Sequence, residues 1–340
     1  MQSMQPWKTR LQQLIALSSR YPRALALFGF ASGLASFLLV ERKESLARLI
    51  ALVMLVSWVW LLLENLLTRS LSRWFRLDLP PPLLRYATQM IHQESLFFVL
   101  PFFFTTTTWN SGQAVFTSLL GLAALVSIVD PLYYHWLAPR RWALMAFHCL
   151  TLFAVLLTTL PLIYQLATPQ SYRLALASTV LLAFPSLLGA LRGQHWRRRL
   201  ILLGLLAALG GAGWWARAWV PPATLWLSEV AVSLEMDGRN REPGASLKRI
   251  DLARLHAQGL YAYTSIHAPR GLNERIYHVW RHAGREVDRI PLEIRGGRRE
   301  GYRAWSHKRR FPENALGRWE VRVQTEAGQL IGVLRFKVVE

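Results

Sequence analysis

Apolar residues run almost without interruption over much of the first 220 positions, and a two-residue alternation replaces them after Pro222. Seven apolar stretches approach the ~20 residues that a helix needs to cross a bilayer. They cover residues 24–40, 46–63, 95–109, 114–132, 143–164, 174–191 and 200–220. This pattern predicts an α-helical transmembrane bundle of about seven spans, in a multi-span transmembrane domain over residues 1–222.

The alternation after Pro222 is typical of strands with one buried face. Trp319, Val321 and Val323, for example, alternate with charged or polar neighbours. Further strand candidates are 230–236, 260–267, 275–281, 286–294, 302–307 and 329–339, and a short helix is expected to end at Gly259. Short strands joined by turns predict an all-β, immunoglobulin-like sandwich domain over residues 223–340.

The charge distribution predicts both partner and orientation. The net charge of +20 suggests nucleic acid at first sight, but most cations before Pro222 flank apolar stretches, where they suit lipid headgroups. Lys and Arg accumulate on the cytoplasmic side of spans. With the N-terminus inside, fourteen cations fall in cytoplasmic segments and four in outer loops. We therefore expect a lipid bilayer as partner rather than nucleic acid, a cytoplasmic N-terminus and an outward C-terminal domain.

Six ionisable residues lie within or at the ends of the predicted spans, all toward the expected cytoplasmic side. This candidate intramembrane polar cluster comprises Glu64, His92, Glu94, Asp130, His135 and His148. Ionisable groups at membrane depth are costly, so they indicate a proton, ion or metal site. A simpler alternative is that they pair with nearby arginines at the headgroup level. No protease, phosphate-loop or nucleophile-elbow motif adds support for an enzyme, so no metal and no cofactor are predicted.

The C-terminal domain carries its own candidate binding surface. This candidate surface is a concentration of arginines in the middle of the domain, made up of Arg295, Arg298, Arg299, Arg303, Arg309 and Arg310. They form either a solvated surface or a site for an anionic ligand. Trp280 and Trp319 are expected in the core rather than as sugar-stacking platforms. Ser306 and His307 point to opposite faces of a strand, which argues against a nucleophile and base pair.

Four segments of the domain carry a family resemblance: "GRNREPG", "IYHVWRHAGREVDRIPLEIRGG", "YRAWSHK" and "GRWEVRVQTEAGQLIGVLRFKV". Together they resemble the bacterial domain of unknown function 2914. The preceding multi-span region is similar to domain of unknown function 5924. The resemblance implies a protein of the bacterial envelope. Together with the charge distribution, this predicts a location in the inner membrane with a periplasmic C-terminal domain. The resemblance implies no reaction.

These observations favour an inner-membrane protein whose outward β-sandwich binds or senses an envelope component or a partner protein. An anionic glycan, a lipid headgroup and an envelope protein all fit the arginine-rich surface. The alternative is a membrane transporter or membrane-embedded enzyme that uses the cytoplasmic-side Glu/Asp/His cluster. The absence of a catalytic motif favours a protein that is not an enzyme.

Overall fold

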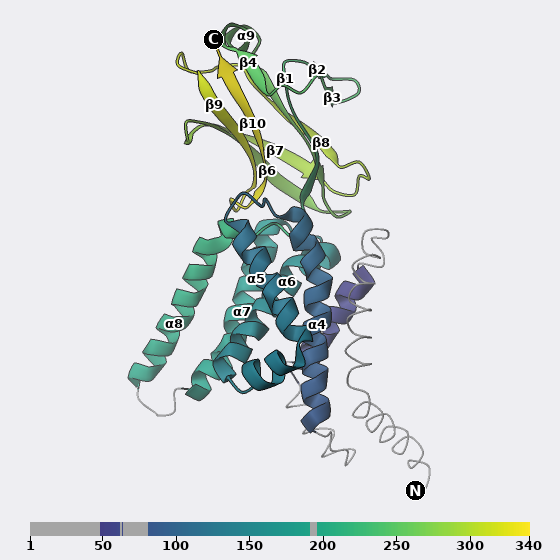
Figure 1. Cartoon of the computed structure of the whole chain (residues 1–340), viewed down its shortest axis with the longest axis vertical. Coiled ribbons are helices and arrows are strands. Elements are labelled where there is room, and N and C mark those ends of the chain that lie inside the picture. Colours follow the sequence, from purple (N-terminus) through teal and green to yellow (C-terminus); the bar gives the residue numbers. More distant parts are fainter. Residues whose placement is uncertain (1–47, 62, 64–80, 191–195) are drawn as a thin grey trace. The chain divides into compact units, whose positions relative to one another are not determined.

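A computed structural model describes residues 48–61, 63, 81–190 and 196–340, with helices first and strands after them (Figure 1). The chain divides into two compact units. Unit 1 contains the described residues up to Pro101 together with Leu120–Val155, and unit 2 contains Phe102–Leu119 and Leu156–Glu340. Unit 2 therefore combines several helical segments with the whole of the β-rich C-terminal domain.

The helical region contains several long, mostly apolar helices. Its helices are Arg48–Leu61, α4 (Pro81–Thr106), α5 (Gln113–Ile128), η1 (Pro131–Leu137, a π-helix), α6 (Arg141–Tyr164), α7 (Thr168–Ala190), α8 (Trp196–Trp215) and η2 (Ala216–Trp219, a 3₁₀ helix). The predicted helical character of this region is confirmed.

The prediction of about seven spans is wrong for the described residues. Two helices are long and apolar enough to cross a membrane, Arg141–Tyr164 and Leu200–Trp219, and a third candidate exists only if α5 and η1 form one span despite a bend of 99°. The stretch 24–40 lies outside the described residues.

Polar side chains and helix breaks explain the difference. The stretch 95–109 falls at the end of α4, whose earlier turns carry His92, Gln93 and Glu94. The stretch 114–132 crosses the break before Pro131, and α7 begins with a polar segment that includes Arg173. Counting apolar residues along the sequence detects none of these interruptions, because the count does not show where a helix begins or ends.

The C-terminal domain consists of two main sheets and a small hairpin. One sheet has the order β1-β5-β8, the second has the order β4-β10-β9-β6-β7, and β2 pairs with β3. The strands are β1 (Trp226–Ser233), β2 (Met236–Asp237), β3 (Glu242–Pro243), β4 (Arg249–Asp251), β5 (Leu260–His267), β6 (Asn273–His282), β7 (Arg285–Arg295), β8 (Tyr302–Lys308), β9 (Gly317–Thr325) and β10 (Leu330–Val339). All pairs are antiparallel except β4 with β10.

One apolar core joins the two sheets. It takes Leu260 and Ile266 from the three-stranded sheet, and Trp280, Trp319 and others from the five-stranded sheet. Both tryptophan rings are fully buried, as the alternation predicts. Burial on this scale is the main source of stability for the domain.

Helix α9 (Leu252–Gln258) ends where the sequence predicts. Gly259 follows it with φ 74°, and its amide donates to the Leu255 carbonyl at 3.0 Å. A Cβ at this position would lie 2.6 Å from the Lys308 carbonyl oxygen. Only glycine combines this left-handed conformation with so close an approach of β8.

Candidate functional site

A column of buried polar side chains follows one face of α4 in unit 1. Gln89, His92 and Ser95 recur at intervals of three residues and are each at most 4% exposed. Positions three apart share a helix face. The sequence therefore places three hydrogen-bonding groups on a face that packs inward.

His92 is the centre of this column. Its Nδ1 lies 2.8 Å from the Tyr133 hydroxyl on η1, and its Nε2 is hydrogen-bonded to Nδ1 of His148 on α6. His92 is fully buried and also contacts the Phe147 ring, with centroids 5.0 Å apart. The result is a continuous array from Tyr133 through His92 to His148, which we call the histidine array.

Neighbouring polar groups extend the column in both directions. One turn before His92, Gln89 donates from Nε2 to the Asp130 carboxylate at 2.8 Å and to the Ser127 carbonyl at 3.1 Å. One turn after it, Ser95 accepts a hydrogen bond from the Trp58 indole at 3.0 Å. Such hydrogen bonds offset the cost of burying polar groups in an apolar helical environment.

The structure brings some of the predicted cluster together and separates the rest. His92 and His148 are in direct contact, and Asp130 joins the column through Gln89. Two further members differ: His135 is exposed on η1, and Glu94 lies two residues past His92, which places it on nearly the opposite face of α4. Glu64 lies outside the described residues.

Among the described residues, no arginine is a hydrogen-bond partner of this column. His92 is hydrogen-bonded to Tyr133 and His148, and Asp130 accepts a hydrogen bond from Gln89. Within the described part of the chain, no group of three or more His, Cys, Asp or Glu residues could hold a metal ion. The array can instead pass a proton along successive hydrogen bonds, since each imidazole can donate at one nitrogen and accept at the other.

Tyr133 and Trp58 were missed by the sequence analysis. Neither residue is charged, and each is separated from His92 by more than thirty positions. The three-residue spacing of Gln89, His92 and Ser95 is the signal that would have identified the buried face of α4.

The candidate arginine surface of the β-domain is divided between two ends of β8. Arg295, Arg298 and Arg299 are exposed at or after the end of β7, before β8 begins, whereas Arg309 and Arg310 are exposed after β8 ends. Seven residues of extended strand separate the two groups by roughly 23 Å. The six arginines therefore do not form one patch.

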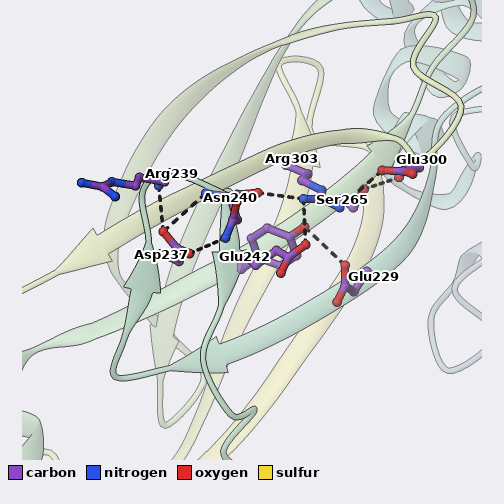
Figure 2. A network of polar contacts seen from close by, with 9 residues as sticks. Glu229, Asp237, Arg239, Asn240, Glu242, Ser265, Glu300 and Arg303 are labelled. Atoms are coloured by element: carbon purple, nitrogen blue, oxygen red, sulfur yellow. Dashed lines mark hydrogen bonds and ion pairs between the residues drawn. The ribbon is translucent and has the colours of Figure 1, made fainter.

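Arg303 is held in a network on β8 (Figure 2). Its guanidinium donates to the Asn240 carbonyl at 2.8 Å and lies 3.3 Å from the carboxylates of Glu242 and Glu300. The network ties the β2–β3 hairpin to β8. Separately, the Tyr263 hydroxyl on β5 donates to the Glu229 carboxylate on β1 at 3.3 Å. Arg303 therefore has a structural role and offers little charge to a ligand.

A second buried histidine lies in the β-domain core. His278 on β6 is hydrogen-bonded to the hydroxyls of Ser306 at 2.9 Å and Thr264 at 3.1 Å. Complete burial lowers the pKa of His278 to about 3. An imidazole that remains neutral at ordinary pH, with both nitrogens occupied, is a core hydrogen-bonding group rather than a base for Ser306.

Within unit 2, the β-domain is hydrogen-bonded to the ends of three helices. The Glu274 carboxylate on β6 accepts from the Thr168 backbone amide at 2.7 Å and from its hydroxyl at 2.9 Å, at the start of α7. The Gln113 side chain of α5 donates to the Leu330 carbonyl at 2.8 Å. The Gln329 side chain donates to the Val220 carbonyl, just after η2, at 2.9 Å. We call this set of contacts the junction.

Glu274 is the most perturbed group of the junction. Burial raises the pKa of its carboxyl to about 7; the two hydrogen bonds from Thr168 oppose the rise and nearby Glu326 adds to it. One carboxylate oxygen, Oε1, is buried without a hydrogen-bond partner in the described structure. A carboxyl in this position changes its charge close to neutral pH.

Comparison with known families identifies both parts of the chain. A family of unknown function, DUF5924, matches residues 4–262, which is more than half of the sequence. The chain belongs to the DUF5924 family. A second family, described as a protein of unknown function (DUF2914), matches residues 273–338. The predicted order, DUF5924 followed by DUF2914, is therefore confirmed. No curated protein and no solved structure matches.

The DUF5924 match extends beyond the helices. It continues through β1 and into β5, so this family includes the first part of the β-domain. The DUF2914 match covers β6 to β10, including Glu274 and the arginine-bearing turn after β7. The histidine array thus belongs to the DUF5924 part, and the junction joins the DUF5924 and DUF2914 parts.

Proposed function

We propose that this DUF5924 protein is an integral protein of the bacterial inner membrane whose periplasmic β-domain binds or senses an envelope component or partner protein. The two main sheets and their common core support an immunoglobulin-like sandwich, an architecture suited to presenting loops to a ligand. Two candidate spans among the described helices support attachment to the bilayer.

The junction is the observation that carries this proposal. A β-domain that served only as a tethered adaptor would need no more than the chain connection after Val220. Here Glu274, Gln329 and Leu330 form hydrogen bonds to three helical segments. A ligand that favours one arrangement of these contacts would shift the helices to which they are bonded. Sensing is therefore favoured over simple tethering.

The junction also bears on which side of the membrane the β-domain occupies. The segments around 109–113 and 164–173 contribute Gln113 and Thr168 to contacts with the β-domain. Segments on one side of a bilayer can meet in this way without crossing it. These contacts support a β-domain on the same side as these loops.

Reporter fusions to the full chain test the location. Alkaline phosphatase fused after Glu340 should be active and green fluorescent protein at the same position should be dark, because only phosphatase matures outside the cytoplasm. Fusions after Arg140, in a predicted cytoplasmic segment, provide the matched control and should give the opposite result. A fluorescent, phosphatase-inactive fusion at Glu340 contradicts a periplasmic β-domain.

A second function, proton transfer through the helical region, is favoured by the histidine array. Tyr133, His92 and His148 form an unbroken chain of hydrogen bonds, and buried ionisable groups in apolar helices are associated with proton pathways. On this alternative the protein is a transporter and the β-domain is an accessory.

Proteoliposomes containing a pH-sensitive dye would test this second function. The full chain should acidify or alkalinise the interior under a proton gradient, and His148→Ala should abolish the flux while the protein still inserts. His135→Gln is the matched control, since this exposed histidine of η1 lies outside the array. Absence of flux with the unaltered chain, or equal loss in both variants, rules out proton transfer by the array.

A further inference from the structure

The outer ends of α7 and α8 carry an aromatic and cationic belt. Trp214 lies within cation–π distance of two arginines, with the Arg173 guanidinium 5.6 Å and the Arg217 guanidinium 4.8 Å from its ring centroid. Trp215 and Trp219 are 73% and 51% exposed beside it. Tryptophan and arginine at the end of an apolar helix mark the level of the lipid headgroups.

The turn between β7 and β8 lies next to the junction. Arg295, the last residue of β7, is paired with Asn273, the neighbour of Glu274 in β6. Two amides of the turn then bond to the preceding loop: Gly296 N–H donates to the Leu272 carbonyl at 2.8 Å and Gly297 N–H to the Ala268 carbonyl at 3.0 Å. Since Glu274 is bonded to the first residue of α7, the turn is at the helix-facing end of the β-domain.

The far side of the turn is also held in place. The Ser265 hydroxyl donates to the Glu300 carbonyl at 2.7 Å, and the Glu300 carboxylate pairs with Arg303 (Figure 2). Gly301 has φ 86°, and a Cβ there would lie 2.5 Å from the Ser265 hydroxyl. The turn therefore presents its side chains from a fixed backbone, which lowers the entropy lost on binding.

Three exposed arginines on this turn face few compensating charges. Among the described residues, no carboxylate lies within ion-pair distance of Arg295, Arg298 or Arg299. The nearby carboxylates of Glu293 and Glu300 pair with other arginines, Arg275 and Arg303. Glu326, an exposed residue of the β9–β10 turn, lies close to Glu274. The guanidinium group forms paired hydrogen bonds to phosphate oxygens.

We propose that this turn, through Arg295, Arg298 and Arg299, binds the headgroups of anionic phospholipids at the outer face of the membrane. The inference rests on the proposed function and names the envelope component that the β-domain senses. The belt of Trp214, Trp215 and Trp219 places headgroup phosphates beside the helix ends, and the junction fixes the turn to those same ends. A headgroup bound there would also contact the segment that contains Glu274.

Hydrogen exchange of the full chain in lipid nanodiscs tests the proposal. Amides of residues 295–301 should exchange about fivefold or more slowly in discs containing phosphatidylglycerol than in phosphatidylcholine discs. The double variant Arg298→Gln/Arg299→Gln should lose this difference. The matched control Arg309→Gln/Arg310→Gln removes equal charge at the other end of β8 and should retain it.

Three results would overturn the proposal: equal exchange in the two lipids, protection that survives Arg298→Gln/Arg299→Gln, or equal loss in the control variant. Inorganic phosphate added to phosphatidylcholine discs separates the lipid from a free anion, because protection by phosphate alone would indicate a soluble ligand. The reporter fusions remain an independent test of the proposed function. A β-domain found in the cytoplasm would contradict that function even if the turn selected anionic lipid.

Discussion

The ionisation of Glu274 makes the stability of the junction depend on pH. Its carboxyl has a pKa of about 7, raised from an ordinary 4.5 by burial, so the folded state binds the proton more tightly than the unfolded state. The stability that this provides is fully present below pH 4.5 and is lost as the pH rises through 7. Near neutral pH, ionisation leaves a buried charge whose Oε1 has no hydrogen-bond partner in the described structure.

We therefore expect Glu274→Gln to flatten the pH dependence of stability between pH 4.5 and 7. Gln can still accept the Thr168 hydrogen bonds but cannot ionise, so a slope of up to about 1.4 kcal/mol per pH unit should disappear. Thermal unfolding of the full chain in detergent at several pH values measures this slope. The exposed Glu293→Gln is the control. Equal slopes in the Glu274 variant and the unaltered chain would contradict the assignment.

His278 should produce the opposite dependence. Burial lowers its pKa from 6.5 to about 3, so the folded state favours the neutral ring. This contribution to stability is complete above pH 6.5 and is lost as the pH falls toward 3.

His278→Gln should weaken the acid sensitivity and lower stability at pH 7 by about 1–3 kcal/mol, because Ser306 and Thr264 lose part of their hydrogen bonding. Urea unfolding at pH 4 and pH 7 separates the two effects. His256→Gln, on the exposed face of α9, should change neither. An unchanged loss of stability between pH 7 and pH 4 in His278→Gln would show that another group controls acid unfolding.

Among the strands, β9 contributes one of the largest fully buried side chains of the β-domain. Trp319 is fully buried, stacks on Phe336 with centroids 6.0 Å apart, and donates from its indole to the Ala315 carbonyl at 2.8 Å. Trp319→Ala should destabilise the β-domain by roughly 3–5 kcal/mol, whereas Trp319→Phe should cost less because it leaves a smaller cavity. Chemical denaturation measures both. A small effect of Trp319→Ala would contradict a core role.

The strands could be predicted because their information is local. A buried residue at every second position, as in Trp319, Val321 and Val323, specifies both the strand and its inward face. The C-terminal end of α9 and the start of β5 likewise follow from Gly259. Span number depends on more than local hydropathy: the polar residues of α4 and the break before Pro131 lower the count, and an apolar window does not record them.

The sites were less predictable because they depend on distant pairings. His92 and His148 were both recognised as candidates, yet nothing in the sequence shows that they touch across 56 positions or that Tyr133 joins them. The six arginines appear as one cluster in the sequence, but β8 divides them by its length. Glu274 lies just before the predicted strand 275–281, and nothing in the sequence indicates that Thr168 packs against it.

For the whole molecule, the central question is how far the β-domain depends on the helices. Its core draws on both sheets and on no helix other than α9 among the described residues. Pro221 and Pro222 disfavour continuation of the preceding helical segment. We therefore expect a soluble fragment, residues 223–340, to fold and to unfold cooperatively.

The fragment should differ from the full chain in one respect. It lacks Thr168, Gln113 and Val220, so Glu274 and Gln329 lose their partners in the junction and gain access to water. Hydration of the Glu274 carboxyl lowers its pKa toward 4.5. The fall in stability between pH 4.5 and 7 should then be absent from the fragment, just as in full-length Glu274→Gln.

Urea unfolding of the fragment across this pH range, followed by tryptophan fluorescence, makes the comparison. An unfolded fragment would show that the β-domain requires the helix ends for its own stability. A folded fragment with the same pH slope as the full chain would show that the β-domain alone buries Glu274, and the junction could then not report pH to the helices. A folded fragment without the slope places the source of the pH response at the contact between β6 and α7.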